Sequence, residues 1–211
     1  MKLYYSAGAC SLAAHIVARE AELPIGLVRV DLSKHLTEDG RNYLEINPRG
    51  YVPLLIRNDG EVMTEVVALL LYLSAQVPQL KLSPPAGSNE YFKLLQWLGF
   101  VSSELHKTVG PWLFIPDAAE STKQSVRNKF GVRLTELDRH LGNQPYLLGE
   151  DFSAVDAYAF TVIAWTRSLK IDLTPYPNLK SYMNRVGTRP KVREALVAEG
   201  LVQQSPEEAE S

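Results

Sequence analysis

Cys10 is the only cysteine among the 211 residues, and it stands in the stretch YYSAGACSLA at 4–13. The pattern around it predicts a strand at 2–5 and a helix that begins at an N-cap Ser11. A helix N-terminus carries unpaired N–H groups and a partial positive charge, which lower the pKa of a nearby thiol. A lone cysteine is usually a small buried hydrophobe, but this position favours a reactive thiol. Because no second cysteine exists, a dithiol redox cycle is excluded and the chemistry needs an external thiol.

Two other polar groups are candidates for the same chemistry. Glu65 falls in the first turn of a helix predicted over 64–75, where a carboxylate either complements the helix dipole or pairs with the ammonium of a ligand. His106 lies within the predicted helix of the stretch SSELHK and by itself reads as a surface or core histidine. The four histidines lack the spacing of metal ligands, so we expect no metal.

The dipeptide Val52-Pro53 opens a predicted strand at 52–56. Proline there is either an ordinary trans residue at a strand start or a cis residue that leaves the backbone groups of Val52 unpaired. In the second case Val52 would be able to pair with an extended peptide as an added strand.

The composition narrows the class of protein. A formal net charge of −2 gives no field that attracts nucleic acid or an anionic membrane surface. No apolar run approaches the roughly 18 residues of a membrane span, and residues 2–8 do not resemble a signal peptide. We therefore expect a cytoplasmic protein with no nucleic-acid or membrane partner.

The order of elements predicts two domains. Residues 1–78 read as strand, helix, strand, then a hairpin at Asn58-Asp59-Gly60 and a helix, which is an α/β domain. Residues 79–88 are rich in proline, glycine and serine and form a linker. Helices are predicted over the whole of 89–201, and 202–211 form a polar tail. The helices are expected at 91–114, 122–141, 155–169, 179–186 and 192–196.

The full set of motifs resembles the glutathione S-transferases, and more closely their bacterial beta class. The resemblance covers essentially the whole chain, and its specificity comes from the combination and not from any one piece. It is carried by YYSAGACSLA at 4–13, HLTEDGRNYLEINPRGYVPLL at 35–55, TEVVALLLYL at 64–73, SSELHK at 102–107 and YLLGEDFSAVDAYAF at 146–160. In the last stretch, Ser153 and Asp156 also read independently as the capping box of a helix.

The resemblance implies a thioredoxin-like N-terminal domain, an all-α C-terminal domain and a homodimer. It implies that Val52-Pro53 is cis and that the Val52 backbone pairs with the cysteinyl part of glutathione. It further implies that Cys10 and His106 are catalytic and face the glutathione sulfur. The remaining glutathione-binding residues that it implies are His35 at the glycine carboxylate, Glu65 and Val66 at the γ-glutamyl end, and Gly99, Ser103, Glu104 and Lys107 along the cleft.

The chain departs from the family pattern at three of these positions. Val66 replaces a small residue, so only its backbone N–H can donate a hydrogen bond. His35 replaces a lysine, and a neutral histidine holds a carboxylate weakly unless Lys34 substitutes. Gly99 stands where asparagine is frequent, which removes a side-chain contact.

We interpret the chain as an enzyme that conjugates glutathione, as a substrate, to small electrophiles that are largely apolar. The helical domain would supply an apolar pocket from Trp112, Phe114, Tyr158 and Trp165, although core packing explains each of these aromatics as well. Two alternatives remain open at this point. One is a monothiol thiol–disulfide reductase that uses Cys10, and the other is a binding protein without enzymatic activity on the same fold.

Overall fold

The computed structural model of the chain describes residues 1–203, which form two compact units. The first contains Met1–Leu80 and the segment that begins at Thr188, and the second contains Lys81–Gly187. The main difference from the predicted domains concerns the last helix. It was expected in the helical domain at 89–201, but it belongs to the first unit. The tail predicted for 202–211 lies outside the described residues except at its first two positions.

The first unit is built on a five-stranded sheet with the order β3-β2-β1-β4-β5. The central strand β1 pairs in parallel with β2 and antiparallel with β4, so the sheet is mixed. The edge strand β3 was not predicted, because its two residues lie in a polar segment. The bounds are β1 Lys2–Tyr5, β2 Gly26–Asp31, β3 Leu36–Thr37, β4 Leu54–Ile56 and β5 Val62–Thr64.

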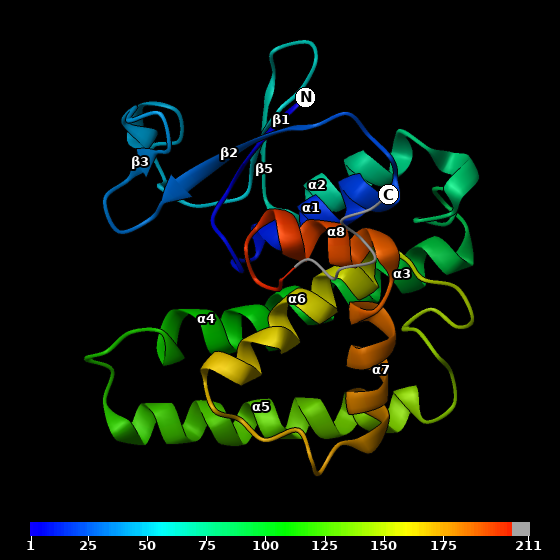
Figure 1. Cartoon of the computed structure of the whole chain (residues 1–211). Helices are drawn as coiled ribbons and strands as arrows, with labels where there is room; N and C mark the ends of the chain where they lie inside the picture. Colours follow the sequence, from blue (N-terminus) through cyan, green and yellow to red (C-terminus); the bar gives the residue numbers. More distant parts are fainter. Residues whose placement is uncertain (204–211) are drawn as a thin grey trace. The chain divides into compact units, whose positions relative to one another are not determined.

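Three α-helices complete the first unit, and Figure 1 shows α8 beside α1. Their bounds are α1 Ser11–Glu20, α2 Val66–Ala75 and α8 Pro190–Ala198, with short 3₁₀ turns at Tyr43–Glu45 and Pro78–Leu80. The predicted N-cap at Ser11 is wrong, because Cys10 is the N-cap and Ser11 is the first helical residue. The Ser11 hydroxyl instead accepts the Ser6 N–H at 3.2 Å and donates to the Ser6 carbonyl at 3.3 Å.

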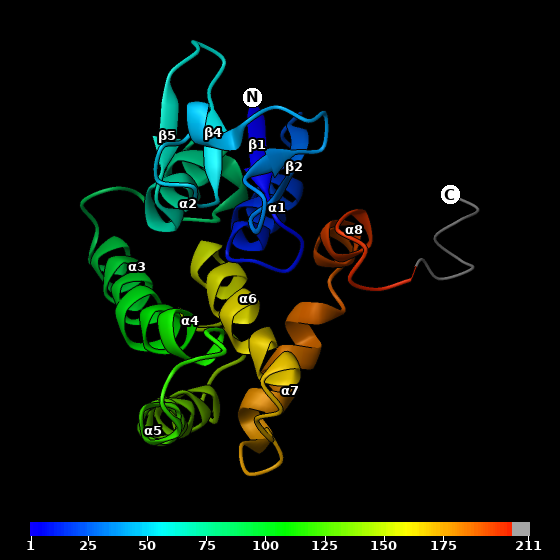
Figure 2. The ribbon, with the colours of Figure 1, turned by 90° about the vertical axis from the view of Figure 1, so that its left-hand side faces the viewer.

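The second unit is helical, as predicted, and α6 packs between α3 and α7 (Figure 2). A single helix was expected over 91–114, but a π-helical turn at Val101–His106 divides it into α3 and α4. The interruption falls where Ser103 donates from its hydroxyl to the Gly99 carbonyl at 2.9 Å. The bounds are α3 Asn89–Phe100, α4 Lys107–Leu113, α5 Glu120–Leu141, α6 Ala154–Ser168 and α7 Pro177–Gly187.

The capping box predicted at the start of α6 is confirmed. Asp156 is fully buried, and its Oδ2 accepts both the N–H and the hydroxyl of Ser153 at 2.9 Å. Its Oδ1 accepts the Leu147 N–H at 2.9 Å and the Tyr182 hydroxyl at 3.1 Å. Burial raises the pKa of Asp156, and these hydrogen bonds oppose that rise. The carboxylate thus ties the start of α6 to α7 and to the preceding loop.

A buried polar chain holds α8 to α1 in the first unit. His15 and Glu199 have fully buried side chains, and His15 Nδ1 lies 3.0 Å from Glu199 Oε1. Arg19 Nε donates to His15 Nε2 at 3.2 Å, and because arginine only donates, the proton of the neutral His15 ring is on Nδ1. Glu199 Oε2 accepts the backbone N–H of Gly8 at 2.9 Å. The carboxylate therefore connects α8 to the loop that leads into Cys10.

We predict that Glu199→Ala lowers the free energy of unfolding by about 3 kcal/mol or more, measured by denaturant titration. The substitution removes the carboxylate that accepts from the buried His15 ring and from the half-buried Gly8 amide. The matched control is Glu194→Ala on the same helix, whose side chain is 44% exposed and pairs with Lys191. That change should stay within about 0.5 kcal/mol. Equal losses in the two variants would contradict the assigned role of Glu199.

Candidate functional site

Cys10 lies at the junction of the first loop and α1, where the sequence placed a reactive thiol. Its Sγ donates to the Val52 carbonyl oxygen at 3.2 Å, and the residue is half-buried. The preceding loop is held by the Ser11 hydroxyl at its start and by Glu199 at Gly8, which has a φ of +70°. The thiol is thus positioned by backbone that is fixed on both sides.

The peptide bond between Val52 and Pro53 is cis, as the resemblance implies. Val52 is buried, and within residues 1–203 its backbone N–H makes no hydrogen bond. The turn before it is rigid, because the Tyr51 carbonyl accepts hydrogen bonds from the Tyr43 hydroxyl at 2.8 Å and the Asn47 amide at 2.7 Å. The N–H that was predicted to pair with a peptide is therefore present and unused.

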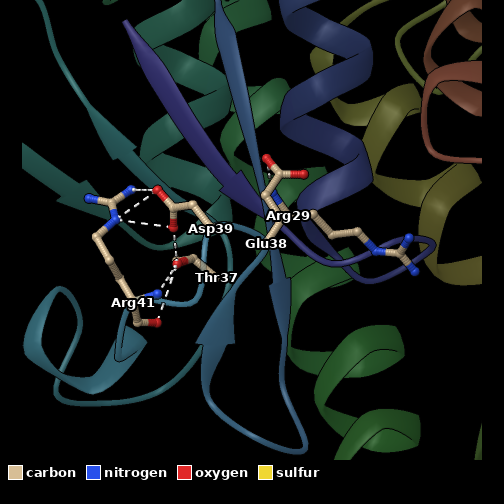
Figure 3. Close-up of polar contacts among 5 residues, drawn as sticks. All are labelled: Arg29, Thr37, Glu38, Asp39 and Arg41. Carbon is tan, nitrogen blue, oxygen red and sulfur yellow. Dashed lines mark hydrogen bonds and ion pairs between the residues drawn. The ribbon is translucent and has the colours of Figure 1, made fainter.

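A polar cluster closes the loop that follows β3 (Figure 3). Arg41 Nε lies 2.9 Å from Asp39 Oδ2, and the Thr37 hydroxyl donates to the same carboxylate. Thr37 Oγ1 also accepts the Arg41 backbone N–H at 3.0 Å. The hydrogen bonds, the one from Arg41 first, lower the pKa of Asp39 to about 2, so the pair stays ionised at neutral pH. The cluster stabilises the chain just after His35.

The His35 ring packs against Gly50. His35 has a left-handed φ of +51°, and a Cβ on Gly50 would lie only 2.8 Å from its Cε1, so a side chain at 50 would collide with the ring. Within the described part of the chain, His35 Nδ1 is buried and makes no hydrogen bond. The neighbouring Lys34 is exposed and lies 3.8 Å from Asp31.

Glu65 and Val66 form the start of α2. Glu65 is its N-cap with a left-handed φ of +71°, an unusual conformation for a residue with a side chain. Its Oε1 lies 3.1 Å from Arg49 Nη1, and both side chains are mostly exposed. The buried Val66 is the first helical residue, where a backbone N–H has no partner within the helix. A carboxylate, a guanidinium and a helix N-terminus therefore lie together at this edge.

In the second unit the π-helical turn carries most of the remaining predicted residues. An added Cβ at Gly99 would meet nothing within 4 Å, so the missing side chain leaves open space. Glu104 is paired with Arg133 at 2.8 Å and Lys129 at 3.6 Å from α5, and the hydrogen bond from Arg133 chiefly lowers its pKa. Lys107 is exposed at the start of α4. Ser103 and Glu104 are thus already engaged within the helices.

His106 contacts two aromatic residues of α6. Its Nδ1 lies 2.7 Å from the hydroxyl of Tyr158 on α6, and its ring meets that of Trp165 edge-on with centroids 5.1 Å apart. Burial, with a smaller contribution from the Lys107 ammonium, lowers the pKa of His106 to about 4. The imidazole is therefore neutral at physiological pH.

The four aromatics predicted to form an apolar pocket divide into two groups. Tyr158 is buried in the core, and Trp165 contacts both His106 and Phe114, the latter with a centroid distance of 5.5 Å. Trp112 and Phe114 are each about half exposed, which core packing does not explain. Three of the four thus form one cluster with the histidine.

Comparisons with known proteins decide the family. Residues 7–76 match the model of the N-terminal domain of glutathione S-transferases, and residues 83–190 match that of the C-terminal domain. The chain belongs to the glutathione S-transferase family. Glutathione S-transferase GstA of Escherichia coli O157:H7 is 41% identical over 95% of this chain and 100% of its own length.

Solved structures of glutathione S-transferases agree with this family assignment. A ternary complex of BphK, a bacterial enzyme of the family, has a TM-score of 0.93 and 49% identity over 95% of this chain and 100% of its own. A sphingomonad glutathione S-transferase in complex with glutathione has a TM-score of 0.91 and 40% identity over 96% of this chain and 100% of its own. The fold predicted from the resemblance is therefore confirmed.

Within the first unit the structure brings Cys10 and Val52 into contact. It places Glu65 and Val66 at one helix start and His35 on a separate loop. Sequence reasoning missed Arg49 as the partner of Glu65, and in the second unit Tyr158 as the partner of His106. Tyr158 stands 52 positions from His106, and no pattern in a single sequence marks such a pair. The left-handed backbone conformation of Glu65 was also missed, because in a sequence that conformation is expected at glycine.

Two absences hold for residues 1–203. No three histidine, cysteine, aspartate or glutamate side chains are grouped so that they would hold a metal ion. No helix in this range is both long and apolar enough to span a bilayer.

We predict that acid destabilises the fold through His106. Between about pH 6.5 and pH 4 the unfolded chain binds a proton on this residue and the folded chain does not, so stability falls as the pH drops. The loss from this residue reaches about 3 kcal/mol at pH 4. In His106→Gln the free energy of unfolding should fall less over this range, as measured by urea titration at several pH values. Parallel curves for the two proteins would rule out this contribution.

Proposed function

We propose that this glutathione S-transferase belongs to the beta class and conjugates glutathione to small, largely apolar electrophiles. One observation carries the proposal. The Cys10 thiol at the start of α1 donates to the carbonyl of Val52, beside cis-Pro53 and an unused Val52 N–H. A thiol and an open peptide N–H at adjacent positions suit a cysteinyl peptide, since one meets its sulfur and the other its backbone.

Glutathione would be held by groups that match its three parts. Val52 would pair with the cysteinyl backbone. Glu65 and the Val66 N–H would bind the ammonium and carboxylate of the γ-glutamyl end, with Arg49 released from Glu65 as the ammonium arrives. His35 Nε2, helped by Lys34, would meet the glycine carboxylate. Gly99, Ser103, Glu104 and Lys107 stay predicted binding residues.

The reaction proposed is a substitution or addition at carbon. The glutathione thiol loses its proton to water, the thiolate sulfur forms a bond to the electrophilic carbon, and a leaving group departs with the bonding electrons. Cys10 and His106 would both stabilise the thiolate, which is the nucleophilic form. Trp112 and Phe114 are the half-exposed aromatics that suit an apolar second substrate.

The protein should be retained on immobilised glutathione and should conjugate glutathione to an activated aryl halide. Glu65→Gln should raise the KM for glutathione about tenfold with little change in kcat, because it removes a charge-assisted contact made to the substrate. His106→Gln should lower kcat at least tenfold. Glu61→Gln, at an exposed position of the same unit, is the control and should match the wild type. Retention without turnover would favour the binding protein over the enzyme.

A second activity is supported by the accessible single thiol of Cys10. A Cys10 thiolate would attack one sulfur of oxidised glutathione, form a mixed disulfide and release one glutathione thiolate. A second glutathione thiolate would then attack the glutathione sulfur of the mixed disulfide, restoring Cys10 and forming oxidised glutathione. With a mixed disulfide of glutathione and another thiol as the substrate, Cys10 attacks the glutathione sulfur and the other thiol leaves. The net result is reduction of that mixed disulfide by one added glutathione, which ends as oxidised glutathione.

Intact-mass spectrometry after incubation with oxidised glutathione should show one glutathione adduct on the wild type. Cys10→Ala should show none, since it has no other thiol. A reducing agent should remove the adduct. If the wild type stays unmodified while it conjugates the aryl halide, the monothiol reductase is ruled out and the transferase is retained.

We also propose a homodimer in the cytoplasm with a role in detoxification. The cytoplasm supplies reduced glutathione and keeps a lone thiol reduced. The homodimer rests on the resemblance to the beta class, in which some glutathione contacts come from the second subunit.

A further inference from the structure

His106 has a defined environment on both sides of its ring. On one side the Tyr158 hydroxyl lies 2.7 Å from Nδ1, and the two rings are nearly perpendicular at 87°. Trp165 is on the same helix, about two turns beyond Tyr158, and meets the ring edge-on. Tyr158 is only 1% exposed, so its hydroxyl and Nδ1 meet in a desolvated environment. A hydrogen bond there costs much to break, because neither group finds water instead.

The chemistry of the two groups decides which one donates. A neutral imidazole has one N–H and one bare nitrogen, whereas a phenol is both donor and acceptor. The phenol O–H is more acidic than the N–H of a neutral imidazole. The bare imidazole nitrogen is in turn a stronger acceptor than the phenol oxygen. The bond is therefore Tyr158 O–H to Nδ1, at a distance typical of a hydroxyl donor. The imidazole proton is then on Nε2.

Gly110 lies beside the Cδ2–Nε2 edge of the His106 ring. It lies four residues after His106, one turn along α4. A Cβ added at Gly110 would lie 3.5 Å from Cδ2 and 3.8 Å from Nε2 of His106, in ordinary van der Waals contact. Glycine inside a helix costs about 1 kcal/mol relative to alanine, although alanine would fit here.

We propose that Tyr158 is a positioning residue that fixes His106 as the Nε2–H tautomer. The inference deepens the proposed function and rests on it. It assigns His106 a single role: Nε2–H donates a hydrogen bond to the thiolate. His106 does not remove the thiol proton through Nε2, because that nitrogen already carries a hydrogen.

Two-bond ¹H–¹⁵N spectra of protein labelled on histidine nitrogen test the tautomer directly, with the His106 signals assigned by their loss in His106→Gln. The wild type should show only the Nε2–H form, and Tyr158→Phe should show a mixture of both tautomers. A wild-type spectrum with the proton on Nδ1 would overturn the proposal even if Tyr158→Phe failed to fold.

Kinetics test whether the tautomer matters for the thiolate. Tyr158→Phe should lower kcat for aryl-halide conjugation about tenfold and raise the apparent pKa of bound glutathione in the kcat profile by about one, with the KM for glutathione within about twofold. An unchanged pH profile in Tyr158→Phe would show that Tyr158 only packs in the core.

Tyr176→Phe is the matched control. It removes another tyrosine hydroxyl of the same unit, which is 3.4 Å from the Gly131 carbonyl and makes no contact with His106. Its spectrum, kcat and pH profile should match the wild type. If the wild type fails to conjugate glutathione at all, the proposed function fails, whereas the tautomer measurement still decides the role of Tyr158.

Discussion

The Glu199 carboxylate is the contact on which the first unit's thiol loop depends. It is fully buried, and it accepts hydrogen bonds from the His15 ring and the Gly8 amide. Removing a charge from water is expensive, and only complete pairing of this kind offsets the expense. The helix α8 is therefore part of the thiol-bearing unit in the physical sense, although it follows the helical unit in sequence. The place of Cys10 is specified by residues at both ends of the described chain.

Much of this fold could be predicted from local patterns. The Asp-Gly turn announced the β4–β5 hairpin, and Ser153 with Asp156 announced the start of α6. The N-cap of α1 could not be predicted, because Ser11 has the preferred residue type but uses its hydroxyl on Ser6 instead. The two-residue strand β3 escaped because pairing with β2, and not its own composition, makes it a strand.

The candidate site was predictable in its residue types and not in its pairings. The sequence indicated Cys10, Glu65 and His106, but their closest polar partners are a backbone carbonyl, an arginine and a tyrosine that are remote in the chain, the nearest 16 positions away. Such pairings arise from tertiary packing, which has no period for a pattern search to detect. The same packing decides what the two unusual residues Val66 and Gly99 do. The Val66 side chain is buried, whereas open space lies where a side chain at Gly99 would be.

Because of the π-helical turn at Val101–His106, the number of residues in this segment determines which way the side chains around it face. A π turn holds one residue more than the α turn it replaces, and single π turns occur often at functional sites. Deletion of one residue there would restore an α-helix and rotate everything on one side of the deletion by about 100° about the helix axis. Tyr158 and His106 would then face different directions although both side chains are still present. An alignment gap within 101–106 would therefore mark a relative whose histidine serves another purpose, however similar the rest of its sequence.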